Sequence, residues 1–201
     1  MFKYVAADEE NNKTLAEIIR DKRGHADTVI PNAVKHHEVV EHINVNAMTS
    51  LVLFQAMFGL LKARKLMQKF IPISSAAGSL SAAAPFGLIV YGGSKVLLNY
   101  ITRRIHFENE WLGAFLHDSE NGFLIPSCPW KSYSRSPHVV RTNLYEQGRE
   151  MDPTHTFKKV SIDEVTKPND ATVLLVDIVE NATRENEGGQ FINIDGSRLP
   201  W

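Results

Sequence analysis

The sequence lacks features that are typical of secreted, membrane and nucleic-acid-binding proteins. It contains one cysteine, Cys128, so no disulfide can form within the chain and a reducing compartment is expected. The formal net charge of −1 gives no electrostatic reason to expect nucleic acid or an anionic membrane as partner. The longest apolar runs, at 51–61 and 80–91, are shorter than the roughly 20 residues that a membrane-spanning helix needs. Polar and acidic residues at the N-terminus argue against a secretory signal. We therefore expect a cytoplasmic protein with no membrane or nucleic-acid partner.

The pattern of apolar and polar residues predicts alternating strands and helices. The expected strands cover 2–8, 26–34 and 69–74, and the expected helices cover 12–24, 37–65 and 91–108. This alternation builds a parallel sheet with helices on both faces, so the expected fold class is α/β with a doubly wound sheet. A chain of 201 residues is long enough for one such domain, covering 1–201, and short for two.

The region after the last of these helices is less regular. "LGAFL" (112–116) is compatible with a strand, whereas residues 117–136 are rich in turn formers and read as an irregular insertion. Order returns with a possible capping box at 161–164, a helix near 171–185, and a final strand in "GGQFINIDG" (188–196).

Tyr91 and Lys95 lie four positions apart, so on a helix their side chains share one face. A nearby ammonium favours the phenolate form of a tyrosine. This suits proton exchange with a carbonyl or alcohol oxygen. The pair by itself is weak evidence of catalysis, because the same spacing arises by chance in many proteins.

The surroundings of this pair carry a specific resemblance. Ser74 and Ser75 end the expected strand 69–74, and the carboxyl ends of strands are where open α/β sheets bind ligands. "SSAAG" (74–78) followed by "YGGSK" (91–95) resembles the central signature of the short-chain dehydrogenase/reductase family. Within that family the chain looks most like fungal reductases of the norsolorinic acid ketoreductase type, in "LVLFQA", "ITRRIHFENEWL", "ATRENEGGQFINIDG" and the terminal "LPW".

The resemblance implies a Rossmann-like fold and assigns four catalytic roles. Tyr91 would be the proton donor to the substrate carbonyl, and Lys95 would favour its phenolate form and bind the nicotinamide ribose. Ser75 would hydrogen-bond the carbonyl oxygen, and Asn46 would hold a water in a proton relay. Without the family context, Asn46 reads as a solvent-facing helix residue, Ser75 as a turn serine and Thr142 as a helix N-cap.

The resemblance also implies a nicotinamide cofactor, NADP, with NAD not excluded. Asn32 matches the family's asparagine after its fourth strand, and "PHVVRTN" (137–143) matches its nicotinamide-holding segment. The residues implied to contact the cofactor are Asp8, Asn32, Tyr91, Lys95, Val140 and Thr142.

One part of the family pattern is missing from the sequence. The family begins with a glycine-rich turn that binds the cofactor pyrophosphate at a helix N-terminus. Here the first glycine is Gly24 and the next is Gly59, so we expect the first two strands and this turn to be absent. In addition, Val34 and His138 stand where the family has glycine.

Two functions remain open. The first is an NAD(P)-dependent oxidoreductase that reduces a ketone or oxidises a secondary alcohol, with a small-molecule carbonyl substrate from fungal polyketide or secondary metabolism. The second is a truncated, non-catalytic relative that acts as a binding or oligomerising protein. Helices 37–65 and 91–108 would form the contacts of a homo-oligomer.

Other reactive residues point to no further chemistry. His36, His37 and His42 do not share one helical face, so we expect a solvated helix start and no metal site. Cys128 has neither a helix N-terminus nor a convincing base near it, so thiol catalysis is not expected.

Overall fold

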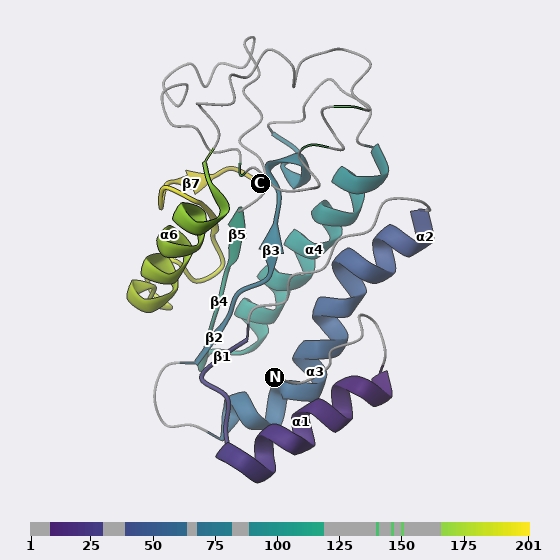
Figure 1. Ribbon diagram of the computed structural model, residues 1–201, viewed down its shortest axis with the longest axis vertical. Coiled ribbons are helices and arrows are strands. Elements are labelled where there is room, and N and C mark those ends of the chain that lie inside the picture. Colours follow the sequence, from purple (N-terminus) through teal and green to yellow (C-terminus); the bar gives the residue numbers. More distant parts are fainter. Residues whose placement is uncertain are drawn as a thin grey trace.

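A computed structural model of the chain describes residues 9–29, 39–63, 68–81, 89–118, 140, 146, 150 and 166–201. The helices are α1 (Glu9–Arg23), α2 (Val39–His42), α3 (Thr49–Lys62), α4 (Ile89–Glu108) and α6 (Pro168–Asn181), with a π-helical turn η1 (Ile43–Met48) and a 3-10 turn η2 (Ala76–Gly78). The strands are β1 (Thr28–Val29), β2 (Gln68–Phe70), β3 (Ile73–Ser74), β4 (Leu112–Ala114), β5 (Leu116–Asp118), β6 (Phe191–Asn193) and β7 (Arg198–Leu199). Helices α3 and α4 lie on one side of the strands and α6 lies on the other (Figure 1).

The strands form one parallel sheet in two stretches. The first has the order β1-β2-β4, and the second has the order β3-β5-β6-β7, in which only β7 is antiparallel. Phe70 pairs with Ala114, and Ile73 pairs with His117. Both pairs have the same separation in the sequence, so the register does not change between the two stretches. The interruption falls at Pro72, which has no N–H to donate. Side chains therefore continue to alternate between the two faces of the sheet across this interruption. The expected doubly wound α/β fold is confirmed for the described residues.

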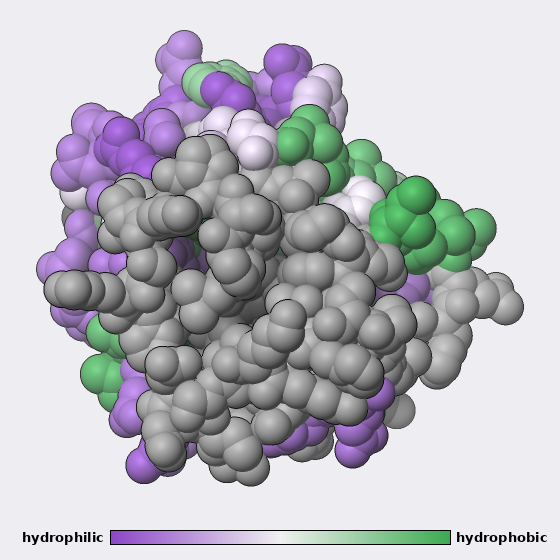
Figure 2. Space-filling model, turned by 90° about the horizontal axis from the view of Figure 1, so that it is seen from above, coloured by the Kyte–Doolittle hydropathy of each residue, from purple (hydrophilic) through white to green (hydrophobic). Residues whose placement is uncertain are grey.

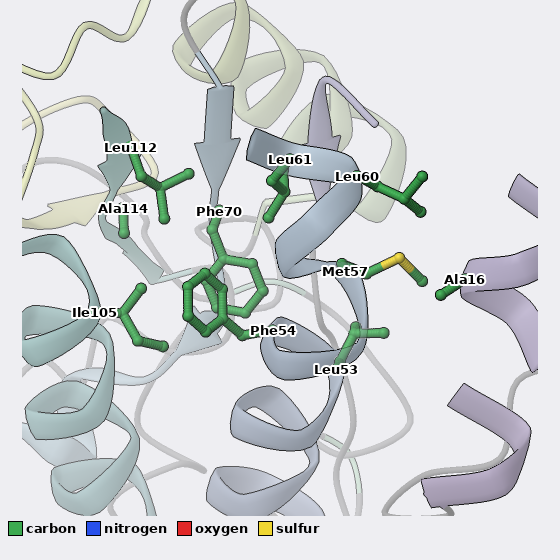
Figure 3. Close-up of a cluster of buried hydrophobic side chains, with 10 residues drawn as sticks. All are labelled: Ala16, Leu53, Phe54, Met57, Leu60, Leu61, Phe70, Ile105, Leu112 and Ala114. Atoms are coloured by element: carbon green, nitrogen blue, oxygen red, sulfur yellow. The ribbon is translucent and has the colours of Figure 1, made fainter. Parts of the chain in front are cut away.

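The larger core lies between the sheet and helices α1, α3 and α4. Phe54 on α3 packs edge-on against Phe70 on β2, with ring centroids 5.2 Å apart. Leu61 and Ile105 close the space from α3 and α4 (Figure 3). The apolar stripe of α3 is thus a core face, as its periodicity indicates.

The opposite face of the sheet is covered by α6. Ile71, Phe115 and Ile192 form a smaller buried cluster there with Ala182, just after the helix. The Nζ of Lys69 donates to the carbonyl oxygens of Val179 at 2.5 Å and Glu180 at 3.0 Å. This lysine therefore satisfies carbonyls in the last turn of α6, which have no partner within the helix.

Two helices end where the sequence predicts, but other bounds differ. Helix α1 begins at Glu9 and not at residue 12, and the helix expected at 37–65 is divided into α2, η1 and α3. Helix α1 ends before Gly24, which has a φ of 78° and donates its N–H to the Arg20 carbonyl oxygen at 2.8 Å. Helix α4 matches the helix expected at 91–108. The helix expected at 171–185 instead begins at Pro168, a favoured first position, and ends at Asn181.

Two further expectations need correction. The insertion expected at 117–136 does not begin at 117, because His117 and Asp118 belong to β5 and pair with β3 and β6. The strand β7, which the sequence analysis did not foresee, adds an antiparallel edge next to β6. The expected strand 2–8 and the capping box at 161–164 lie outside the described residues.

The segment Val39–Lys62 is long and apolar enough, by length and composition alone, to cross a membrane. This corrects the expectation that no apolar stretch reaches that length, since the helix continues beyond the run at 51–61. A core helix of a soluble protein passes the same test, and here Phe54, Met57 and Leu61 of this segment are buried in the core. We therefore treat it as a core helix.

Candidate active site

Tyr91 and Lys95 lie on the first turns of α4, at the carboxyl end of β3. Both side chains are buried, and Lys95 is 1% exposed. The Lys95 Nζ lies 5.5 Å from the centroid of the Tyr91 ring and donates to the carbonyl oxygen of Ile73 at 3.0 Å. Burying an ammonium is costly unless it is hydrogen-bonded, so this contact stabilises the lysine beside the phenol.

Asn46 reaches the same helix from η1. It is 3% exposed, so the alternative of a solvent-facing asparagine is wrong. Its Nδ2 donates to the Oγ of Ser94 at 2.9 Å, and that hydroxyl donates to the carbonyl oxygen of Tyr91 at 2.7 Å. A buried hydrogen-bonded path thus joins Asn46 to the backbone of Tyr91.

The position of Asn46 depends on a π-helical turn between α2 and α3. Thr49 donates its backbone N–H and its Oγ1 to the carbonyl oxygen of Asn44, which is five residues back. Such turns hold one residue more than an α-helical turn, and they occur frequently at functional sites. The segment contains neither proline nor glycine, so this turn could not be predicted from the residues.

Ser75 caps the short turn η2. It is fully buried, and its Oγ accepts the backbone N–H of Ala77 at 3.2 Å. Ser75 is therefore a turn serine, because its oxygen caps the turn. Its hydroxyl hydrogen is not used in that contact and can be donated to another group. The preceding Ser74 donates its Oγ hydrogen to the Oδ1 of Asn99 at 2.5 Å.

The turn η2 lies very close to α4. A Cβ added at Gly92 would lie 2.7 Å from the carbonyl oxygen of Ala77. One added at Gly78 would lie 2.8 Å from the Cβ of Lys95. Glycine at both positions thus allows the turn that carries Ser75 to pack directly on the helix that carries Lys95.

His42 is a neighbour of this group that the sequence analysis expected to lie in a solvated helix start, and for this residue that expectation is wrong. It is buried, and its Nδ1 lies 3.5 Å from the Nδ2 of Asn46. Its ring is edge-on to Tyr91, with centroids 6.3 Å apart. The signal available in the sequence was its place one helical turn before Asn46.

Of the remaining candidate residues, Val140 is the one that the structure describes. Val140 is buried, forms a parallel bridge with Thr166 and packs with Ala171 and Ile194. Asp8, Asn32 and Thr142 lie outside the described residues.

Comparisons with known proteins show what the chain is similar to. No family model matches it. It is 27% identical to a norsolorinic acid ketoreductase of Aspergillus parasiticus, over 96% of this chain and 68% of that protein. It is 31% identical to a norsolorinic acid ketoreductase of Dothistroma septosporum, over 81% of this chain and 53% of that protein. A short chain dehydrogenase of Penicillium aethiopicum is 29% identical over 82% of this chain and 59% of its own length. The chain is thus similar to members of the short-chain dehydrogenase/reductase family.

The fold of this chain is also that of solved structures. Carbonyl reductase Sniffer of D. melanogaster has a TM-score of 0.74 and 16% identity, covering 100% of this chain and 77% of that one. An NADPH-bound carbonyl reductase from chicken fatty liver has a TM-score of 0.72 and 18% identity, covering 98% of this chain and 75% of that one. The chain thus spans 53–68% of the length of the three curated relatives above.

The described residues fit the reactive end of a nicotinamide cofactor. The ammonium of Lys95 and the phenol of Tyr91 are donors suited to ribose hydroxyl and carbonyl oxygens. The Oδ1 of Asn46 is a buried acceptor with no hydrogen-bond partner in the structure, which fits a bound water or hydroxyl group.

Proposed function

We propose that this chain is an NAD(P)-dependent oxidoreductase that reduces a ketone or oxidises a secondary alcohol. The observation that carries the proposal is the buried group of Tyr91, Lys95 and Asn46. Ser94 joins Asn46 to the backbone of Tyr91, and Lys95 lies beside the Tyr91 ring. NADP is the proposed cofactor, in keeping with a solved neighbour that binds NADPH, while NAD stays possible on the residues described.

The cofactor, when bound, supplies or accepts the hydride. In the direction of reduction, Tyr91 donates its phenolic proton to the carbonyl oxygen as charge develops there. The positive charge of Lys95 beside the ring stabilises the phenolate that remains. Ser75 donates its hydroxyl hydrogen to the same carbonyl oxygen, and Asn46 holds a water that returns a proton to Tyr91.

The wider contacts and setting of the enzyme follow the family resemblance. Asp8, Asn32, Val140 and Thr142 are the proposed additional cofactor contacts. The substrate is a small-molecule ketone of fungal secondary metabolism, in keeping with the ketoreductase names of two relatives. A cytoplasmic location remains a prediction.

A second candidate is a non-catalytic relative that acts by binding or oligomerising. The observation that favours it is exposed apolar surface on two helices. Exposed apolar residues occur on the helices proposed to make homo-oligomer contacts, namely Val39 and Val40 on α2 and Ile89 and Tyr100 on α4. Figure 2 shows hydrophobic surface on the side of the molecule where α2 lies in Figure 1.

Nucleotide titration separates the two candidates. NADPH and NADH are titrated into the protein and followed by nucleotide fluorescence. Binding of either with a Kd tighter than about 1 mM supports the oxidoreductase, whereas weaker binding of both supports the non-catalytic relative.

Tyr91→Phe tests the chemistry. With NADPH and a panel of aromatic and aliphatic ketones, kcat is expected to fall roughly 10²- to 10⁴-fold, because the proton donor is lost. The Kd of NADPH is expected to change little. The matched control is Tyr100→Phe, since Tyr100 lies on the same helix but is 64% exposed. Equal activity of the two variants would remove Tyr91 from the mechanism.

A further inference from the structure

We infer that Asn99 is a positioning residue, which fixes the turn carrying Ser75 onto the helix carrying Tyr91 and Lys95. This inference rests on the proposed oxidoreductase function. The hydrogen bonds of Asn99 go to Ser74 and Gly78, and its role is to hold Ser75 in place.

The amide of Asn99 bridges the two ends of the turn. It is 3% exposed. Its Oδ1 accepts the Oγ hydrogen of Ser74 at 2.5 Å, just before the turn. Its Nδ2 donates to the carbonyl oxygen of Gly78 at 3.0 Å, at the end of the turn. A single planar group therefore ties down both ends of the segment that carries Ser75.

The same helix face makes the other contacts to this segment. Asn99 follows Lys95 by four positions and Tyr91 by eight, so the three side chains lie on one face of α4. The Lys95 Nζ holds the carbonyl oxygen of Ile73 directly before the turn. Gly92 allows the backbone of Ala77 to approach the helix. Asn99 is thus the third of three positions along α4 at which the turn contacts this helix.

Only an amide meets both requirements at this position. The carboxylate of an aspartate would accept from Ser74 but could not donate to Gly78, and it would face a carbonyl oxygen. An apolar side chain would leave the hydroxyl of Ser74 and the carbonyl of Gly78 without this partner in a buried place. The pair of contacts therefore explains why asparagine stands here.

The consequence for the reaction is geometric. The hydroxyl of Ser75 can stabilise a developing charge only where the turn places it relative to the Tyr91 phenol. A displacement of about 1 Å at such a group can lower the rate by about 10²-fold. Loss of Asn99 is therefore expected to lower kcat while leaving the affinity for NADPH nearly unchanged.

The first test reads the turn in the nucleotide-free protein, so it does not depend on activity. The amides of Ala77, Gly78 and Ser79 close the turn by bonding to Ser75 and Ala76. In Asn99→Ala, hydrogen exchange at these three amides is expected to rise about tenfold, because the turn opens more easily. Exchange in α1 and β6 is expected to stay as in the wild type. Unchanged exchange at the turn overturns the inference, and a rise everywhere marks a global loss of stability instead.

The control is Asn109→Ala. The Nδ2 of Asn109 also donates to a backbone carbonyl, that of Ile105 at 2.9 Å, but at the far end of α4. This variant is expected to leave both the exchange of the turn and the kcat unchanged. An equal effect on the turn from Asn109→Ala would contradict a specific role for Asn99.

The second test reads the reaction. Asn99→Ala and Asn99→Asp are expected to lower kcat for ketone reduction about 10- to 100-fold, with the Kd of NADPH within about twofold of the wild type. Unchanged kcat in both variants overturns the positioning role. If the wild type itself reduces no ketone, the proposed function fails, while the exchange measurement still decides whether Asn99 holds the turn.

If Asn99→Ala does not fold, Ser74→Ala takes its place in the exchange measurement. This change removes one of the two contacts of Asn99 and leaves its contact with Gly78. It is expected to raise exchange at the turn less than Asn99→Ala does. In a variant carrying both changes, the effects should be less than additive, because Ser74 and Asn99 act through one hydrogen bond. Additive effects would show that the two residues act independently.

Discussion

The two faces of the sheet differ in how completely the described chain covers them. On the face of α1, α3 and α4, ten buried side chains form one cluster, and the polar groups near Tyr91 are largely hydrogen-bonded to one another. On the face of α6, four buried side chains form the corresponding cluster. Val173, Leu174 and Val176 of α6 are exposed there. The residues proposed for catalysis therefore sit on the better packed face.

A buried histidine marks the same difference. His117 follows Phe115 by two positions in a strand of unbroken register, so it lies on the face of α6. It is fully buried, and neither ring nitrogen has a hydrogen-bond partner in the structure. Burial lowers the pKa of His117 to about 4. By contrast, the oxygen and the nitrogen of the Asn99 amide both have hydrogen-bond partners. The face covered by α3 and α4 is therefore the one organised around polar contacts.

The largest expected effect tests the packing of the first face. Phe54→Ala removes a buried ring that contacts Phe70, and it should lower the free energy of unfolding by about 3–5 kcal/mol in urea denaturation. Val173→Ala on α6 is the matched change on the other face. Because Val173 is 68% exposed, its effect should stay within about 0.5 kcal/mol. Equal losses in the two variants would abolish the distinction between the faces.

The next effect concerns pH. The pKa of His117 is lower in the folded chain than its ordinary value of 6.5, so the unfolded chain binds more protons between these limits. The stability contributed by neutral His117 is thus present above about pH 6.5 and is lost as the pH falls to about 4. The loss should be about 3 kcal/mol, measured by urea denaturation at pH 7 and pH 4.

His117→Leu isolates this effect, because leucine fills the buried space without a titrating group. The variant should lose less stability than the wild type between pH 7 and pH 4. His106 also has a lowered pKa, caused first by burial and then by the charge of Arg184, and it contributes to both proteins alike. An identical pH dependence in the two proteins would show that His117 is not buried as described.

The smallest effect concerns the anchoring of α6. Lys69→Met removes the cation that binds the carbonyls of Val179 and Glu180, and it should cost about 1 kcal/mol. Amide exchange in the last turn of α6 should rise with it. Lys167→Met is the control, because Lys167 stands at the opposite end of the helix, where a positive charge opposes the helix dipole. A greater loss from the control would show that the helix end is not held by Lys69.

Parts of the site could be predicted because they depend on spacing within one element. The spacing of Tyr91 and Lys95 puts both on one helix face, and Ser75 follows directly from the end of a strand. The same local reasoning located α1 with its terminal glycine, and α4 to within two residues. It failed for the bounds of α6 and for His117, where the pattern in the sequence reads as a turn-rich insertion and the sheet supplies the pairing.

What the sequence by itself determined is therefore the class of fold and the family resemblance, from which the residues proposed for proton transfer follow. Only the tertiary structure decided which other residues meet them. The contact of Asn46 with Ser94 spans 48 positions, and that of Ser74 with Asn99 spans 25. The first depends on a π-helical turn and the second on two glycines that allow close approach. Periodicity fixes the direction of a side chain on its own element, whereas such contacts depend on how the elements pack.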